Sequence, residues 1–361
     1  MTGPPLDQGV LVVGTGLLGT SLGLALRRAG VEVWLNDSDA DALARAVDLG
    51  AGIPRGVGPP AGLAVVAVPP AVTAAVVADV LGHGLAEYAT DVASVKVLPA
   101  AQVRTLANEP GRYVGGHPMA GREVSGPESA LVDLFDGRPW VLCPDENTDP
   151  HAVTRALAVA RLVGAVPVTM PAADHDAAVA LVSHAPHLVA ALVAGRLAGA
   201  PEHEIRLAGA GVSDVTRVAA GDPVLWSEIL AANAAAVADV LADLRSDLDR
   251  ALAALASPAA VGRRDDLTRL LRSGVDGRGR LPGKHGAPPT DYATVAVVVD
   301  DRPGQLAALF ADAGRAGVNV EDVRIEHSPG QPVGTVELDV RPGADVALTA
   351  ALRAAGWSVR G

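Results

Sequence analysis

His117, His184 and His187 are the side chains whose type and spacing most favour chemistry. His117 follows a predicted strand at residues 112–114 and stands in the sequence GGHP. Ligands bind at the carboxyl edge of open α/β sheets, and a histidine there can act as a general base. The alternative is a loop histidine hydrogen-bonded to the backbone. From these residues alone the loop histidine is the more common case, and it is the sequence motif around His117 that makes it the expected proton acceptor.

His184 and His187 are three residues apart on a predicted helix and therefore share a face. Pro186 between them is expected to begin or kink that helix. Neither a carboxylate nor a cysteine accompanies them at ligand spacing, so we predict no metal. Anion binding is the favoured interpretation, and packing is the alternative. His175, in the sequence DHD, is expected only to help begin a helix.

A glycine-rich turn near the N-terminus predicts a dinucleotide site. Gly14, Gly16 and Gly19 form GTGLLG directly after a predicted strand at residues 10–13, with Leu17 and Leu18 beginning a helix. Glycines in this context let the backbone approach a pyrophosphate at the positive end of the helix. A tight turn without a ligand is the alternative.

Asp37 ends the second predicted strand, where an acidic residue can accept hydrogen bonds from the adenosine ribose. Ser38 and Asp39 follow it and offer no cation for a 2′-phosphate. We therefore expect NAD rather than NADP. The alternative is that Asp37 or Ser38 caps the next helix.

Three domains and a linker are expected to position these residues. Buried strand patterns at 10–13, 31–35, 63–68 and 139–143 alternate with alanine-rich helices, which predicts an α/β Rossmann domain with a parallel, doubly wound sheet over residues 1–171. Residues 172–272 have helical spacing only, and their apolar content favours an all-α domain shared in a homodimer. Residues 273–290 are predicted to be a linker, and residues 291–361 follow the βαββαβ order of a ferredoxin-like α+β module.

Composition excludes several classes of protein. The chain has 361 residues, 49% of them hydrophobic, and a formal charge of −12, which argues against a general nucleic-acid surface. Cys143 is the only cysteine, so no intramolecular disulfide can form. No secretory signal and no uninterrupted apolar run of about 18 residues is visible. We expect a cytoplasmic protein that does not enter the membrane, with a locally positive pocket if its substrate is an anion.

Four sequence blocks resemble the prephenate/arogenate dehydrogenase family, and the resemblance covers nearly the whole chain. They are TDVASVK at 90–96, GGHPMAGREVSG at 115–126, SHAPH at 183–187 and GAGVSDVTRVAAGDPVLW at 209–226. The resemblance implies oxidative decarboxylation of prephenate to 4-hydroxyphenylpyruvate with NAD, a step of tyrosine biosynthesis. It also implies that the C-terminal module is an ACT regulatory domain.

The same resemblance assigns roles to further residues. It implies that Ser94 shares the substrate hydroxyl with His117, that Arg217 grips a substrate carboxylate, and that Glu123 lines a gate. Trp226 is expected to cap the pocket or to pack. The alternatives are a helix cap at Ser94 and solvated surface charges at Arg217 and Glu123.

Ser213 departs from the family pattern. The family usually has a basic residue there, four positions before Arg217 and on the same helix face. Its loss weakens the grip on a dianion such as prephenate and favours an amino-bearing analogue such as arogenate. Arg122 has the opposite effect, because it adds a positive charge where the family often has a neutral residue.

The C-terminal module carries two turns that resemble ACT effector sites, DDRPGQLA and GVNVEDV. Tyrosine bound near Gly304 and Asn319 is the expected effector. The alternative is a module that only dimerises or has lost its ligand.

A dehydrogenase of β-hydroxy acids and a non-catalytic regulator are the two alternative functions. A Rossmann dehydrogenase of β-hydroxy acids typically relies on a lysine in its helical domain, and residues 174–272 contain none. A non-catalytic NAD-binding regulator with an ACT domain is favoured only by Ser213. The presence of Ser94, His117 and Arg217 together favours the enzyme.

Overall fold

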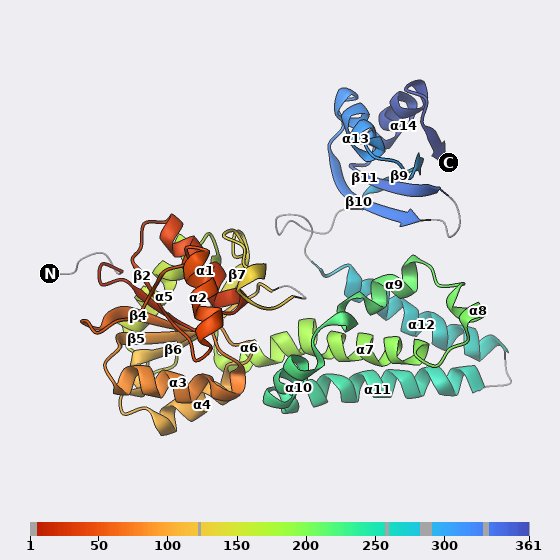
Figure 1. Cartoon of the computed structure of the whole chain (residues 1–361). Coiled ribbons are helices and arrows are strands. Elements are labelled where there is room, and N and C mark those ends of the chain that lie inside the picture. The colour runs from red at the N-terminus through yellow and green to blue at the C-terminus, as the bar shows by residue number, and fades with distance from the viewer. Residues whose placement is uncertain (1–5, 122–123, 257–259, 282–290, 328–331, 361) are drawn as a thin grey trace. The chain divides into compact units, whose positions relative to one another are not determined.

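The computed structural model describes residues 6–121, 124–256, 260–281, 291–327 and 332–360 (Figure 1). The chain divides into two compact units, Met1–Ser246 and Asp247–Gly361. The first unit contains an eight-stranded sheet and most of the helices that follow it. The second contains the last helices and a four-stranded sheet.

The eight strands lie in the order β3-β2-β1-β4-β5-β6-β7-β8. The neighbouring strands β1 and β4 are buried along their whole length because helices cover both faces of the sheet, and their sequences are correspondingly free of charge. The strands are β1 Val10–Val13, β2 Val33–Asn36, β3 Ile53–Pro54, β4 Ala61–Val66, β5 Ala86–Asp91, β6 Tyr113–Pro118, β7 Pro139–Cys143 and β8 Val166–Thr169.

Helices on the two faces of this sheet enclose two separate hydrophobic cores. One core lies under α1 (Leu17–Arg28), α2 (Ala40–Asp48) and α5 (Pro150–Leu162). The other lies under α3 (Pro70–Gly82) and α4 (Val97–Leu106). Short 3₁₀ turns at Pro110–Arg112 (η1) and Pro127–Ser129 (η2) flank β6 and its following loop. The Rossmann-like arrangement expected from the sequence is confirmed.

The expectation of an entirely parallel sheet is wrong at one edge. β6 and β7 pair antiparallel, with His117 opposite Val141, so β7 and β8 run against the other strands. A parallel return would need a crossover, usually a helix, and the described part of the segment between Pro118 and Pro139 holds only the short turn η2. The chain therefore reverses directly, and β6 ends beside the start of β7.

The segment after β8 is helical, as predicted. It contains α6 Ala172–Val179, a π-helical turn Ala180–His184 (η3), α7 Ala185–Leu197, α8 Glu202–Ile205, α9 Ala210–Thr216, the 3₁₀ turn η4 Arg217–Ala220, α10 Pro223–Ala232, α11 Ala234–Ala256 and α12 Ala260–Arg278. The predicted linker is wrong over its first six residues, because α12 continues through Gly274 and Gly277 to Arg278. Residues 282–290 lie outside the described part of the chain.

One described helix, Ala172–Leu197, is long and apolar enough to cross a membrane by length and composition; α10 and α11 pass the same test only as a pair with a 94° bend between them. Ala172–Leu197 buries His175, Asp176 and His184 in polar contacts. The cytoplasmic location stays a prediction.

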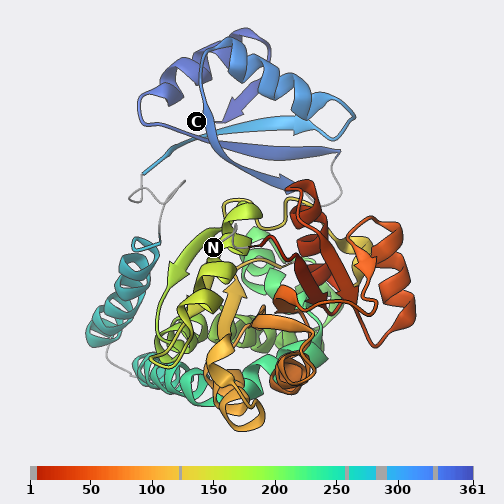
Figure 2. The same ribbon diagram turned by 90° about the vertical axis from the view of Figure 1, so that its left-hand side faces the viewer.

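The C-terminal module has the βαββαβ order predicted for it. It consists of β9 Ala293–Asp300, α13 Gln305–Arg315, β10 Val320–His327, β11 Val333–Val340, α14 Ala344–Ala354 and β12 Ser358–Arg360, with antiparallel strands in the order β10-β11-β9-β12. Both helices lie on one face of the sheet (Figure 2) and enclose the third core. Whether the module is an ACT domain stays a prediction.

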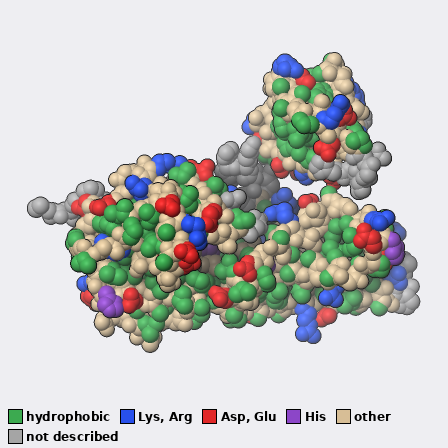
Figure 3. Space-filling model, viewed as in Figure 1, with side chains coloured by type: hydrophobic (Ala, Val, Ile, Leu, Met, Phe, Trp, Pro, Cys, Tyr) green, Lys and Arg blue, Asp and Glu red, His purple; other side chains and the backbone are tan. Residues whose placement is uncertain are grey.

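Charged side chains are mixed on the surface. The face shown in Figure 3 carries Lys and Arg side chains scattered among acidic and hydrophobic ones, with no large basic patch. This distribution agrees with the net charge of −12.

Candidate active site

The turn between β1 and α1 is shaped by its three glycines. Gly14 has a φ of +96°, and a Cβ on it would lie 2.3 Å from the carbonyl oxygen of Ala67. A Cβ on Gly19 would lie 1.8 Å from the carbonyl oxygen of Gly14, so only glycine lets α1 pack on the turn. A Cβ on Gly16 would meet nothing within 4 Å. Gly14 and Gly19 therefore build the turn, and Gly16 faces open space.

The beginning of α1 borders that open space. Gly16 is its N-cap and supplies no side-chain hydrogen bond, and its first turn contains no acidic residue. Leu17 and Leu18 are partly exposed there. The free N–H groups and the positive end of the helix dipole suit an anion such as a pyrophosphate.

Asp37 follows β2 and is fixed to the glycine turn. Its Oδ2 accepts hydrogen bonds from the backbone N and Oγ1 of Thr15, at 2.5 and 2.8 Å, and its Oδ1 accepts one from the N of Asp39. Burial raises the pKa of Asp37, but these hydrogen bonds outweigh burial and lower it overall. The carboxylate is charged at neutral pH. The helix cap of α2 is Asp39, so the alternative of a cap at Asp37 or Ser38 is wrong.

His117 lies in β6 and contacts a second histidine from α6. Its Nδ1 is 2.8 Å from Nε2 of His175, and the two rings meet edge to face. Nδ1 of His175 is in turn 2.7 Å from Oδ1 of Asp176. Burial lowers the pKa of His117 well below its usual value near 6.5, and the nearby charge of Lys96 lowers it further. His117 is therefore neutral at pH 7, as a proton acceptor must be.

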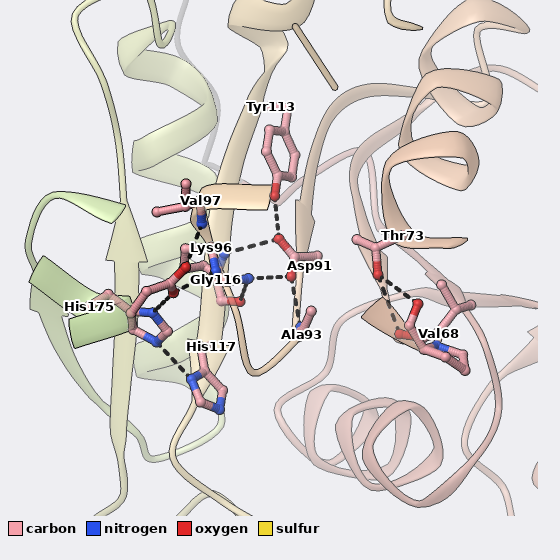
Figure 4. A network of polar contacts seen from close by, with 12 residues as sticks. Val68, Thr73, Asp91, Ala93, Lys96, Val97, Tyr113, Gly116, His117 and His175 are labelled. Carbon is pink, nitrogen blue, oxygen red and sulfur yellow. Dashed lines mark hydrogen bonds and ion pairs between the residues drawn. The ribbon is translucent and has the colours of Figure 1, made fainter. Parts of the chain in front are cut away.

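A buried ion pair lies beside His117 (Figure 4). Lys96 and Asp91 are both fully buried, and Nζ of Lys96 contacts Oδ1 of Asp91 and the carbonyl oxygen of Gly116. Asp91 also accepts hydrogen bonds from the hydroxyl of Tyr113 and from the backbone N of Ala93. Burial raises the pKa of Tyr113 well above 10, and Asp91 adds to the shift. The pair thus holds β5, the loop after it and β6 in register just before His117.

His184 and His187 lie where π-helix changes to α-helix. His184 ends the π-helical turn, α7 begins at Ala185, and Pro186 stands in the first turn of α7. π-helical turns are frequent at functional sites. The hydrogen-bond donor Nδ2 of Asn233 lies 3.1 Å from Nδ1 of His184. Burial lowers the pKa of His184 to about 4.

His187 stacks on Trp226 of α10, with ring centroids 3.5 Å apart and an angle of 11°. Burial lowers the pKa of His187 too. Both histidines are therefore neutral near pH 7 and offer hydrogen bonds rather than positive charge to an anion. Gly221 lies close against this stack, because a Cβ on it would be 2.5 Å from Nε1 of Trp226.

Arg217 begins the 3₁₀ turn η4, directly after α9, and is exposed. Ser213 is exposed one helical turn earlier, on α9. Arg217 and Ser213 thus lie on two elements that both pack against α7, the helix of His187.

Ser94 lies in the loop between β5 and α4 and is partly buried. The N-cap of α4 is Lys96, so Ser94 does not cap this helix. Its hydroxyl makes no hydrogen bond to any other residue that the structure describes. Glu123 and Arg122 lie outside the described residues.

Gly304 and Asn319 occupy turns of the C-terminal module. Gly304 is the N-cap of α13 with a φ of +88°, as its turn requires. Asn319 donates a hydrogen bond to Glu321 and lines a surface hollow of about 460 Å³ together with Arg341. The effector role of these residues stays a prediction.

Four residues of the site were missed by sequence reasoning: Asp91, Lys96, His175 and Asp176. The sequence contained a signal for the first pair, since an Asp ends a strand and a Lys follows five residues later within TDVASVK. His175 and Asp176 were attributed to a helix start. The contact of His175 with His117, 58 residues away, depends on how α6 packs against the sheet.

Comparisons with known proteins agree with this arrangement. Residues 22–169 match the nucleotide-binding domain of prephenate dehydrogenase, and residues 171–273 match its dimerization domain. The probable prephenate dehydrogenase NovF of Streptomyces niveus is 40% identical over 354 residues, which cover 96% of this chain and 98% of that protein. The chain belongs to the prephenate dehydrogenase family. The match is long enough to include most of the C-terminal module.

Two solved structures of family members resemble the chain closely. Prephenate dehydrogenase from A. aeolicus, in complex with hydroxyphenyl propionate and NAD+, has a TM-score of 0.65 and 28% identity and covers 74% of this chain and 97% of its own. Arogenate dehydrogenase from Synechocystis has a TM-score of 0.63 and 30% identity and covers 74% and 98%. The family thus contains enzymes named for both candidate substrates.

Proposed function

We propose that this member of the prephenate dehydrogenase family converts prephenate to 4-hydroxyphenylpyruvate by NAD-dependent oxidative decarboxylation, in tyrosine biosynthesis. The observation that carries the proposal is the position of His117 in β6, with its Nδ1 2.8 Å from Nε2 of His175 and with further hydrogen-bonding side chains on α6, α7 and α10. The complex of the A. aeolicus relative with hydroxyphenyl propionate and NAD+ supports it.

The residues of the β1–α1 turn fit NAD. The open space in front of Gly16 and the uncapped beginning of α1 suit its pyrophosphate, and the charged Asp37 suits the hydroxyls of its adenosine ribose. When bound, NAD supplies the acceptor for the hydride. The turn itself contributes binding and orientation.

His117 and Ser94 act on the substrate hydroxyl. His117 takes the hydroxyl proton as the carbon that bears the hydroxyl is oxidised. The lowered pKa of His117 permits this at neutral pH. Ser94 shares that hydroxyl through its own Oγ. Loss of the ring carboxylate as CO₂ then moves the electron pair of its C–C bond through the ring to the oxygen, which takes up a proton to give the phenol. Aromatisation drives the reaction. The protein mainly has to position the ring and polarise the hydroxyl.

Arg217 anchors a substrate carboxylate with the two parallel hydrogen bonds that a guanidinium offers. His184 and His187 add neutral hydrogen-bond donors, and Trp226 covers one side of His187. Glu123 is proposed to line the gate to this pocket. The roles of Arg217 and Glu123 rest on their family motifs.

Absorbance of NADH during incubation with prephenate or arogenate, and with NAD or NADP, tests the proposal. We expect turnover with NAD, and we expect His117→Asn to lower kcat by about 10²- to 10⁴-fold because the base is lost. Exposed His151 provides the matched control, His151→Asn, which is expected to retain activity. An inactive wild type, or an active His117→Asn variant, would contradict the proposal.

Arogenate is the second candidate substrate, and Ser213 is the observation that favours it. Ser213 is exposed one turn before Arg217, where the family usually has a basic residue, so a positive charge is missing beside the anchor. The 30% identity with Synechocystis arogenate dehydrogenase agrees with this alternative. A comparison of kcat/KM on both substrates, for wild type and Ser213→Arg, separates the two. A wild type that strongly prefers prephenate and is unaffected by the substitution rules arogenate out.

Assembly and regulation complete the proposal. The match to a family dimerization domain supports a homodimer formed by the helical segment. Tyrosine is proposed to bind the C-terminal module near Gly304 and Asn319. Inhibition by tyrosine that is weakened in Asn319→Ala would support this role, and equal activity with and without tyrosine would contradict it.

A further inference from the structure

His117 is one end of a chain of three side chains. Nδ1 of His117 lies 2.8 Å from Nε2 of His175 (Figure 4). Nδ1 of His175 lies 2.7 Å from Oδ1 of Asp176. The other two side chains are buried, His175 with 1% and Asp176 with 4% of its surface exposed. A buried row of polar groups has to satisfy its own hydrogen bonds, so the proton positions in it are constrained.

Asp176 determines which atoms donate and which accept in the hydrogen bonds of these three side chains. Its Oδ1 accepts a hydrogen bond from the backbone N of Lys96 at 2.8 Å, and its Oδ2 accepts one from the backbone N of Val97 at 2.9 Å. These N–H groups belong to the beginning of α4, where the N-cap Lys96 makes no side-chain capping hydrogen bond. The carboxylate can therefore only accept, and the third donor it receives is Nδ1–H of His175.

The tautomers of both histidines follow from this donor. A neutral His175 with its proton on Nδ1 has a lone pair on Nε2, so the hydrogen bond to His117 must come from Nδ1–H of His117. A neutral His117 with its proton on Nδ1 has its lone pair on Nε2. Nε2 is the atom left to act as the base.

Neighbouring elements hold this chain rigidly in place. Nδ2 of Asn233, at the junction of α10 and α11, donates to the carbonyl oxygen of Asp176 at 2.8 Å. Lys96 contacts the carbonyl oxygen of Gly116, directly before His117. The geometry is thus fixed by the sheet, by α4 and by the α10–α11 junction before any substrate arrives.

We propose that His175 and Asp176 are positioning residues that keep His117 in its Nδ1–H tautomer and stabilise its charged form during the reaction. The O–H bond of the substrate breaks and its electron pair becomes the second bond of the carbonyl, while the C–H bond on the same carbon breaks and its pair leaves with the hydride. The proton forms a new bond with Nε2 of His117. Nδ1–H of the imidazolium remains hydrogen-bonded to His175, whose Nδ1–H faces the negative charge of Asp176. This inference rests on the proposed function, since it concerns the base of that reaction.

His175→Phe is the variant that tests the inference. Phenylalanine keeps the flat ring and removes both hydrogen bonds, while the two backbone contacts of Asp176 with α4 remain. We expect kcat to fall by at least about tenfold, with KM for NAD and for substrate changing less than about twofold. His83→Phe is the matched control, because His83 is exposed at the end of α3 and lies outside this chain.

The tautomer is measured separately, by NMR of the full chain with ¹⁵N-labelled histidine rings. The His117 signals are assigned by their loss in His117→Gln. We expect Nδ1–H in the wild type and in His83→Phe, and a shift towards Nε2–H in His175→Phe. This spectrum needs no turnover, so a wild type without activity would refute the proposed function and leave the tautomer testable.

Three outcomes would overturn the inference. The first is an Nε2–H tautomer of His117 in the wild type, which remains decisive even if His175→Phe does not fold. The second is a folded His175→Phe variant with kcat within about twofold of wild type. The third is a loss of kcat in that variant with the tautomer of His117 unchanged, which would indicate a structural role only.

Discussion

At the residue scale, the pH profile follows from the surroundings of His117. Burial first, and the charge of Lys96 second, lower its pKa well below 6.5. His117 accepts a proton only while neutral, and the inactive protonated form accumulates as the pH falls through this lowered pKa. We therefore expect that protonation of His117 does not change kcat/KM above pH 6.5, and that kcat/KM falls only at more acidic pH. An acid limb centred at or above pH 6.5 in the measured profile would contradict this.

Single residues differ in how well the sequence alone could place them. The glycines of the first turn were predictable, because they follow a buried strand directly and local order decides their position. His117 was expected after a strand ending at residue 114, but it lies within the longer strand β6 near its carboxyl end. The partners of His117 were not predictable. His175 reaches it across 58 residues, and Asp176 reaches Lys96 across 80, through packing that no local pattern encodes.

At the scale of elements, different glycines of the β1–α1 turn serve folding and cofactor binding. Gly16 has φ −70° and ψ −161°, which alanine can also adopt, and a Cβ there meets nothing. Gly16→Ala should thus leave the melting temperature unchanged while its methyl group obstructs the pyrophosphate. We expect NAD affinity to fall by at least about tenfold, which corresponds to about 1.4 kcal/mol.

Gly14→Ala is the contrasting variant of the same turn. Its φ of +96° and the 2.3 Å approach to Ala67 predict a loss of about 1–3 kcal/mol in the free energy of unfolding. Thermal unfolding and calorimetric titration with NAD, run on both variants, distinguish the two effects. A Gly16→Ala variant that binds NAD as well as the wild type would remove the turn from the cofactor site.

The elements themselves were largely predictable, and the errors have physical reasons. The strand at Pro139–Cys143 was found from its apolar run, but its direction was not, because direction depends on the missing crossover after β6. The glycines at 274 and 277 suggested a linker, although the rest of α12 carries the helix past them to Arg278. Local propensity is a weak guide where a helix is already formed on one side.

At the scale of the whole molecule, α11 carries an apolar stripe that a monomer would leave in water. Leu244, Leu248, Leu252 and Leu255 are 44–58% exposed, and their spacing of four, four and three places them on one face. Such stripes mark interaction surfaces. The helix lies within the segment that matches a dimerization domain, so we assign the stripe to the contact between two copies of the chain.

Leu248→Glu combined with Leu252→Glu tests this assignment. Each leucine buried at an interface contributes about 1.5–3 kcal/mol, and the double variant places four carboxylates in the dimer where four leucines were. We expect a dimer for the wild type and a monomer for the variant in sedimentation equilibrium. Ala242→Glu with Ser246→Glu adds the same charge to the opposite, exposed face of α11 and should remain dimeric. A monomeric wild type, or a double leucine variant that stays dimeric, would show that the stripe serves another contact.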